Sequence, residues 1–165
     1  MTSTYRGYTF EQIAKTLDHS VLKPEVTAAD IAAGAAIALK YDTASYCVQG
    51  VNIAQAAELL AGSNVPVCAT VGFPHGAITS AAKAFEATEA TRNGATEVDM
   101  VVNIGKVIGG DWDYVEDEIS QIMDATLEHN AILKVIFEND YLNDDQKIQL
   151  CKICSGLHVA FVKTS

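Results

Sequence analysis

Short β-branched and apolar runs alternate along the chain with longer segments in which apolar residues recur at helical spacing. Runs of this kind predict strands. The six predicted strands are Thr16–His19, Ala44–Gln49, Val65–Val71, Glu97–Ile104, Ile132–Phe137 and Val159–Lys163. A helical segment separates each successive pair, and the strand starts lie roughly 20 to 35 residues apart, as in consecutive βαβ units. The pattern therefore predicts an α/β chain with a parallel sheet and no internal linker.

The predicted helices begin at capping residues, and several end at a glycine. Thr9 with Gln12, and Thr27 with Asp30, have the spacing of a capping box. The later predicted helices are Ile53–Ala61 after Asn52, about Thr79 to Gly94, Asp111–His129, and Asn143 to about Gly156. These segments supply the crossovers that parallel strands require.

Two architectures fit this alternation, the closed (β/α)8 TIM barrel and the open doubly wound sheet. Alternate residues of a strand share a face, and several predicted strands gather polar groups on one face. These faces are Ser45/Cys47/Gln49, Cys68/Thr70/Gly72, Asp99/Val101/Asn103, Lys134/Ile136/Glu138 and Phe161/Lys163/Ser165. Barrel enzymes place their chemistry at the carboxyl ends of such strands. No glycine-rich turn follows the first predicted strand, where a nucleotide-binding doubly wound sheet usually has one. We therefore predict a TIM barrel of which this chain supplies about six βα units, with the doubly wound sheet as the alternative.

The charge balance limits the possible partners. The 165 residues contain 21 Asp and Glu against 11 Lys and Arg, which gives a formal net charge of −10. Such a chain repels polyanions, so we predict no nucleic-acid partner. The apolar runs are strand-sized, and the first residues lack the apolar core of a signal peptide, which predicts a soluble, cytoplasmic protein without a membrane segment.

The four cysteines predict neither disulfides nor a metal site. Two fall in predicted strands, and Cys151 and Cys154 have C-x-x-C spacing inside a predicted helix, without a second ligand pair. His19 and His75 lack partners at metal-ligand spacing, and we interpret them as polar loop residues.

Two lysines lie within apolar strands, where an ammonium group is costly to bury. They are Lys134 and Lys163, and Asp99 is an ionisable group on the strand before them. A lysine must be neutral to attack a carbonyl, and desolvation together with a nearby ammonium lowers its pKa. A carboxylate in the same pocket can transfer the protons of such a reaction. We therefore expect Lys134 to lower the pKa of Lys163.

A structural interpretation of the same residues stays open at this point. Asp99 and Lys134 could form a buried salt bridge, while Lys163 only extends its ammonium from a strand end to solvent. Spacing alone does not decide between a structural pair and a catalytic lysine.

Five ordered motifs resemble the successive signatures of the deoxyribose-phosphate aldolase family. They are Leu17–Pro24 (LDHSVLKP), Val71–Gly76 (VGFPHG), Glu97–Gly105 (EVDMVVNIG), Leu133–Glu138 (LKVIFE) and Phe161–Ser165 (FVKTS). The match runs from about residue 10 to the last residue. The resemblance implies a class I aldolase that cleaves 2-deoxy-D-ribose 5-phosphate to glyceraldehyde 3-phosphate and acetaldehyde in deoxyribonucleotide catabolism, without a metal or another cofactor.

The resemblance also implies roles for three ionisable residues. Lys163 would form the Schiff base, Asp99 would donate and accept protons, and Lys134 would tune the pocket and hold Asp99. The implied partner is a phosphorylated sugar, and a homodimer is the assembly to test.

Four further positions match pocket residues of the family, namely Asp18, Ser20, Cys47 and Phe73. A simpler interpretation accompanies three of them. Asp18 could bond backbone groups at the strand end, Cys47 could be an inert buried thiol, and Phe73 could only stiffen a turn.

The family barrel has eight strands, and the motifs of the last two are absent from these residues. They include a second active-site lysine and the loops that hold the substrate phosphate. We expect residues 1–165 to form a single barrel domain that lacks two βα units and is part of a longer chain. A truncation rescued by partner chains, and an inactive fragment that serves as an assembly or binding module, are the alternatives.

Overall fold

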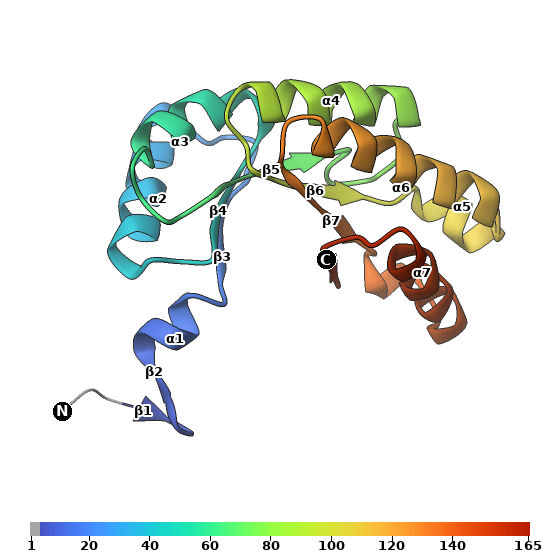
Figure 1. The fold of residues 1–165 in the computed structure, drawn as a ribbon, viewed down its shortest axis with the longest axis horizontal. Coiled ribbons are helices and arrows are strands. Elements are labelled where there is room, and N and C mark those ends of the chain that lie inside the picture. The colour runs from blue at the N-terminus through green and yellow to red at the C-terminus, as the bar shows by residue number, and fades with distance from the viewer. Residues whose placement is uncertain (1–3) are drawn as a thin grey trace.

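A computed structural model describes residues 4–165, which form a curved six-stranded parallel sheet with helices along its outer side (Figure 1). The strands are β3 (Asp18–Val21), β4 (Ser45–Val48), β5 (Val67–Val71), β6 (Glu97–Val101), β7 (Ile132–Ile136) and β8 (Phe161–Lys163). They lie in sequential order from β3 to β8. A doubly wound sheet reverses its strand order at a switch point, and this sheet does not. The predicted barrel architecture is confirmed, and the doubly wound alternative is wrong.

The predicted helices are present, with ends moved by one or two residues. The helices are α1 (Phe10–Ala14), α2 (Ala28–Tyr41), α3 (Ile53–Leu59), α4 (Ser80–Arg92), α5 (Ile104–Gly109), α6 (Trp112–Leu127) and α7 (Asp144–Gly156). Both predicted capping boxes form, at Thr9 and Thr27, and Asn143 makes a third. Short 3-10 turns, η1 (Gly50–Asn52) and η2 (Asn139–Tyr141), follow β4 and β7.

The first predicted strand, Thr16–His19, was placed too early. The amides of Thr16 and Leu17 donate to the carbonyls of Ile13 and Ala14, so these two residues continue the turn that ends α1. Strand β3 therefore begins at Asp18.

Besides the two 3-10 turns, a short helix and a hairpin were not predicted. The run Glu97–Ile104 was predicted as one strand, but β6 ends at Val101 and α5 begins at Ile104. The side chain of Asn103 accepts from the Lys106 amide and caps α5, so a capping residue within an apolar run was the overlooked signal. The other missed element is a hairpin, β1 (Thr4–Tyr5) and β2 (Tyr8–Thr9).

The apolar core lies between the sheet and the outer helices. Val98 and Met100 of β6 point outward and are fully buried with Ile119 and Ile122 of α6. A second cluster packs α2 and α3 against β4 and β5. Asp99, between Val98 and Met100, therefore faces the other side of the sheet, which is the barrel interior.

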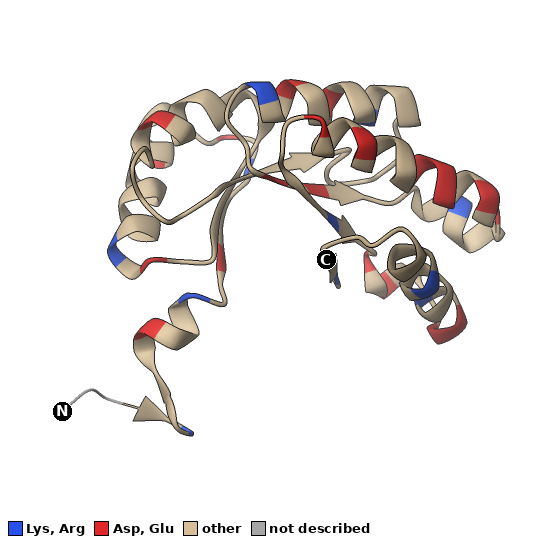
Figure 2. Ribbon diagram, in the orientation of Figure 1, with Lys and Arg blue, Asp and Glu red and all other residues tan. Residues whose placement is uncertain are grey.

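Acidic residues are spread along α4 and α6 as well as on β6 (Figure 2). Among the described residues, no helix is both long and apolar enough to cross a membrane.

Candidate active site

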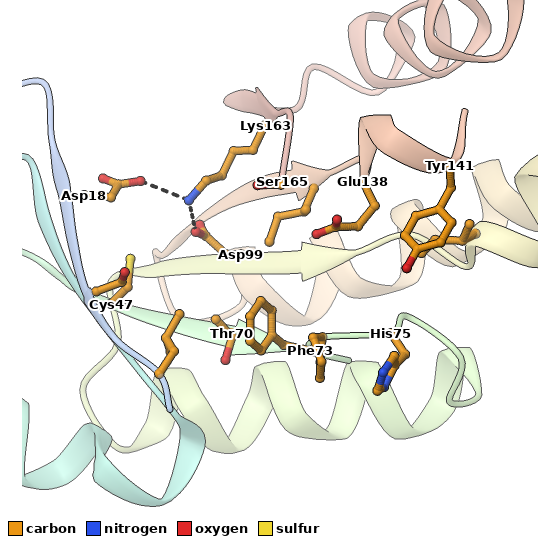
Figure 3. Close-up of a pocket in the computed structure, with 15 residues that line it drawn as sticks. Asp18, Cys47, Thr70, Phe73, His75, Asp99, Glu138, Tyr141, Lys163 and Ser165 are labelled. Carbon is orange, nitrogen blue, oxygen red and sulfur yellow. Dashed lines mark hydrogen bonds and ion pairs between the residues drawn. The ribbon is translucent and has the colours of Figure 1, made fainter. Parts of the chain in front are cut away.

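A cavity of about 770 Å³ opens at the carboxyl ends of the strands (Figure 3). All six strands of the sheet, or the loops that follow them, contribute to its lining. The lining residues are Asp18, Ser20, Leu22, Cys47, Thr70, Phe73, Pro74, His75, Asp99, Ile104, Ile136, Glu138, Tyr141, Lys163 and Ser165. The cavity therefore collects most of the residues singled out from the sequence.

Lys163 ends β8 and directs its ammonium group into the cavity (Figure 3). Its Nζ donates to Asp18 Oδ2 at 3.0 Å and to Asp99 Oδ2. Burial disfavours the charged form, but the bonds to Asp99 and Asp18 outweigh burial and raise the pKa of Lys163 above its ordinary value. The Lys163 side chain keeps 23% of its surface exposed, but its ammonium is paired with two carboxylates and is not free at the strand end as in the structural interpretation.

Lys134 lies opposite Asp99 in the register of β6 and β7, and its side chain is almost fully buried. Its Nζ lies 2.7 Å from Glu97 Oε2, 3.1 Å from Asp18 Oδ2 and 3.2 Å from Asp99 Oδ1. Burial opposes the charged form, but the surrounding carboxylates hold the pKa of Lys134 above its ordinary value. The buried Asp99–Lys134 pair of the structural interpretation is therefore present.

The net lowering of the Lys163 pKa that burial and Lys134 were expected to produce is wrong for the described residues. Three carboxylates, from Asp18, Glu97 and Asp99, surround two ammonium groups, so the local charge is negative. All three carboxylates contact the ammonium of Lys134, and those of Asp18 and Asp99 also contact Lys163. Attraction from the carboxylates outweighs repulsion from Lys134.

Asp18 connects both lysines to β4. Its Oδ1 accepts from the Ser45 hydroxyl at 2.7 Å, while its Oδ2 accepts from Lys134 and Lys163. Burial alone would raise its pKa, but these bonds and the charge of Lys134 lower the pKa of Asp18 to about 2. In the described part of the chain, the Asp18 carboxylate accepts hydrogen bonds from side chains. The simpler interpretation expected bonds to backbone groups instead.

The other three predicted positions also reach the cavity lining. Ser20 lies two residues after Asp18 on the same face of β3. Cys47 is buried 3.5 Å from the Ser45 hydroxyl and opposite Cys68 in the register, and the Cys68 thiol lowers the pKa of Cys47. Phe73 is partly exposed at the cavity and precedes Pro74 through a cis peptide bond.

Several residues of the site were not singled out from the sequence. Glu97 is two residues before Asp99 and therefore on the same face, a signal that was available. Ser45 was placed on the polar face of its strand with Cys47 and Gln49, but no role was assigned to it. Tyr141 lies on the cavity through η2, and no strand pattern marks it. His75 lies in a loop, as predicted, and lines the cavity, whereas His19, also predicted as a loop residue, lies in strand β3.

One group of side chains has the spacing of metal ligands. The ligand atoms of Cys47, Cys68 and Asp99 lie within 4.8 Å of one another. Lys134 and Lys163 both contact Asp99 and would repel a cation, and burial raises the pKa of Cys68 well above its ordinary value. The group fits a metal ion poorly, because metal binding needs the thiolate.

The arrangement combines a primary amine, a carboxylate in contact with it and a cavity for an organic molecule. Asp99 Oδ1 has no aligned hydrogen-bond donor among residues 4–165, although Lys134 Nζ lies 3.2 Å away. An amine and a carboxylate placed in this way can form a Schiff base and move the associated protons.

The chain is similar to curated proteins named deoxyribose-phosphate aldolase. The relative from Rhodopirellula baltica is 44% identical over 158 residues, which are 96% of this chain and 66% of the relative. The relative from Clostridium perfringens is 44% identical over 155 residues, which are 94% of this chain and 69% of the relative. The chain thus spans about two thirds of the length of these relatives.

Solved structures agree with the sequence relatives. A structure of a putative deoxyribose-phosphate aldolase from Coccidioides immitis has a TM-score of 0.89 at 32% identity, and the match covers 96% of this chain and 62% of that one. The deoxyribose phosphate aldolase from Aeropyrum pernix, described as having a unique tetrameric structure, has a TM-score of 0.87 at 26% identity, covering 95% and 65%. No protein-family model matches the chain.

Proposed function

The chain belongs to the deoxyribose-phosphate aldolase family, and we propose that it carries the Schiff-base chemistry of a class I aldolase acting on 2-deoxy-D-ribose 5-phosphate. One observation carries the proposal most directly. The amine of Lys163 ends in the cavity and contacts the carboxylate of Asp99. The product pair would be glyceraldehyde 3-phosphate and acetaldehyde, in the breakdown of deoxyribonucleotides.

The proposed reaction begins with a neutral Lys163. Its amine attacks C1 of the open-chain sugar, and the carbinolamine loses water to give an iminium ion. A base removes the proton of the C3 hydroxyl, the C2–C3 bond breaks, and its electron pair forms an enamine. C3 leaves as the aldehyde of glyceraldehyde 3-phosphate. Protonation of the enamine at C2 and hydrolysis then release acetaldehyde and restore the lysine.

Asp99 is the proposed proton carrier, because its carboxylate already contacts the nucleophile. It would accept the proton that Lys163 must lose, and later exchange protons with the C3 hydroxyl and with C2. Asp18 and Lys134 would hold Asp99 and Lys163 in register through the shared ion pairs.

The negative local charge favours the protonated form of Lys163, which opposes nucleophilic attack. A further ammonium group near Lys163 would lower its pKa. The family resemblance implies such a lysine outside the matched motifs, together with the loops that hold the phosphate. We therefore propose that turnover of the whole sugar phosphate depends on groups beyond those described.

Reductive trapping tests the nucleophile. With acetaldehyde and borohydride, the protein should gain one ethyl group, and peptide mapping should place it on Lys163. Trapping should increase with pH, since the neutral amine is the minor form of a group with a raised pKa. Lys163→Met is the matched control and should gain no adduct at that site. An adduct found mainly on Lys134 or Lys23 would refute the assignment.

Assembly and location follow the same proposal. The relatives are aldolases of a small phosphorylated sugar by name, and one solved relative is described as tetrameric. We propose a cytoplasmic enzyme that self-associates, with the homodimer as the first assembly to test by light scattering. The alternative of an inactive binding module has no observation in its favour.

A further inference from the structure

A fully buried ion pair lies behind the cavity, between helices α4 and α6. Lys83 Nζ is 2.8 Å from Glu118 Oε1, and neither side chain has any exposed surface. Burying two charges is costly even when they pair, and apolar residues of similar size are often equally stable or more so. Burial accordingly lowers the pKa of Lys83, although Glu118 opposes the shift. Stability alone is therefore a poor explanation of the pair.

The pair also bonds the backbone where β6 ends. Lys83 Nζ donates to the carbonyl of Val101 at 2.8 Å, and Glu118 Oε2 accepts from the amide of Asn103 at 3.0 Å. Asn103 caps α5, and the next residue, Ile104, lines the cavity. The two charges thus fix the turn that leads from β6 into the cavity wall.

The loop between β5 and α4 rests on the same lysine. Gly72 has φ +64°, and a Cβ added there would lie 2.8 Å from Cε of Lys83. The Gly72 amide donates to Glu86 Oε2 at 2.7 Å, one turn of α4 further on. A Cβ on Gly76 would lie 1.9 Å from the carbonyl oxygen of Val102. The loop that carries Phe73 is therefore packed directly on Lys83 and on the end of β6.

The residues that line the cavity are held in place in two different ways. Lys163 and Asp99 project from paired strands, so the sheet holds them. Phe73 and Pro74 come from the loop after β5, Ile104 begins α5, and Figure 3 shows Phe73 across the cavity from Lys163. Sheet hydrogen bonds hold none of these three residues, whereas the Lys83–Glu118 pair supports the loop after β5 and bonds the turn that leads into α5.

We propose that Lys83 and Glu118 are positioning residues that hold the Phe73, Pro74 and Ile104 wall against the part of the sugar beyond the Schiff base. The inference rests on the proposed function for the identity of that sugar. The directional bonds of the charged pair, to Val101 and Asn103, explain why charges occupy a site that apolar side chains could fill. Acetaldehyde, which ends at the Schiff base, does not need this wall.

The test compares a double variant, Lys83→Met with Glu118→Leu, with a control, Lys147→Met with Asp144→Asn, which removes an exposed pair on α7. Hydrogen exchange followed by mass spectrometry should be at least about tenfold faster at residues 72–79 and 103–109 of the double variant, because local opening becomes easier there. Residues of α2 should exchange as in the wild type. The control should leave exchange at both segments as in the wild type.

Trapping at Lys163 provides a readout that simple destabilisation does not reproduce. In the double variant, the 2-deoxyribose 5-phosphate concentration for half-maximal trapping should rise about tenfold, whereas acetaldehyde trapping should stay within about twofold, since only the sugar reaches the wall. Equal losses for both carbonyls, or unchanged exchange at both residues 72–79 and residues 103–109, would overturn the positioning role. If the wild type forms no adduct at Lys163, the proposed function fails, and the exchange data alone decide whether the pair holds these two segments.

A second variant covers the case in which the double variant does not fold. Glu118→Gln keeps the shape but leaves one acceptor oxygen for two donors, Lys83 and the Asn103 amide. Exchange at residues 103–109 should again be faster than in the wild type. Wild-type exchange in this variant would overturn the proposal.

Discussion

At the scale of single residues, the proposed proton transfer depends on Asp99. Asp99→Asn keeps the shape but removes the proton-accepting carboxylate. Exchange of acetaldehyde methyl protons with D2O, measured by NMR, should slow by at least about a hundredfold, the low end of general acid–base effects. The same change removes a carboxylate that raises the Lys163 pKa, so borohydride trapping should shift to lower pH. Glu97→Gln is the control, because Glu97 pairs with Lys134 and not with Lys163. Proton exchange in Glu97→Gln should therefore stay much faster than in Asp99→Asn. Wild-type exchange in Asp99→Asn would limit Asp99 to a structural role.

Lys134 should affect both charge and stability. Lys134→Leu leaves Asp18, Glu97 and Asp99 without the ammonium that they share, so Lys163 should hold its proton more tightly and trapping should shift to higher pH. Removing one partner of a buried pair should cost about 3 to 5 kcal/mol in the free energy of unfolding. Urea unfolding and the pH profile of trapping measure the two effects. The control Lys106→Leu, which breaks an exposed pair, should leave the free energy of unfolding close to the wild-type value. An unchanged pH profile would show that Lys134 has no influence on Lys163.

The Asp18 carboxylate should make the free energy of unfolding depend on pH in the acidic range. Its pKa falls from 3.8 to about 2 in the folded protein. A carboxyl group with a depressed pKa contributes its full stabilisation above its unfolded pKa and loses it as pH falls through the folded pKa. The stability difference between wild type and Asp18→Asn should therefore be constant above about pH 5 and shrink as pH falls from about 4 towards 2. Urea unfolding at several pH values measures it. A difference that grew on acidification would contradict the ion-pair role of Asp18.

At the scale of elements, the start of α5 depends on one cap. The Asn103 side chain accepts from the Lys106 amide at 3.1 Å. Asn103→Ala should lower the free energy of unfolding by about 1 kcal/mol, a typical loss for a helix cap. Asn103→Asp retains the acceptor oxygen and should lose much less. Equal losses in urea unfolding of the two variants would show that the side-chain bond is not the cause.

At the scale of the whole molecule, β3 and β8 are the edges of the sheet that residues 4–165 form, each with one neighbouring strand. An unpaired buried backbone group costs roughly 1 to 3 kcal/mol, and a domain's net stability is only about 5 to 15 kcal/mol. Exposed edges also promote association. We therefore expect the 165-residue polypeptide to self-associate or unfold partly, as measured by light scattering and urea unfolding, and to show no retro-aldol activity. A fusion to the C-terminal third of the Clostridium perfringens relative should be well folded and active, and it is the form of the protein for the trapping, exchange and unfolding experiments. A monomeric, cooperatively folded and active 165-residue polypeptide would contradict this expectation.

The alternation of strand and helix patterns was sufficient to predict the order of the main elements and the parallel sheet. Capping boxes at Thr9 and Thr27 were readable because their bonds join residues three apart in sequence. Face parity placed Asp99, Lys134 and Lys163 in the barrel interior, because strand geometry alternates regardless of tertiary context. The start of β3 and the short helix α5 were missed, since a few hydrogen bonds decide such boundaries.

Only the tertiary structure decided which charges meet. Asp18 and Lys163 are far apart in sequence, and curvature of the sheet brings the side chains of β3 and β8 to 3.0 Å. The carboxylates around Lys163 reversed the expected direction of its pKa shift, because a Coulomb interaction depends on distances that no sequence pattern contains. The Lys83–Glu118 pair likewise could not be predicted from the sequence, since its two residues lie on different helices and meet only when α4 packs against α6. Local patterns determine elements and faces, whereas packing between distant segments determines the charge environment in which a side chain acts.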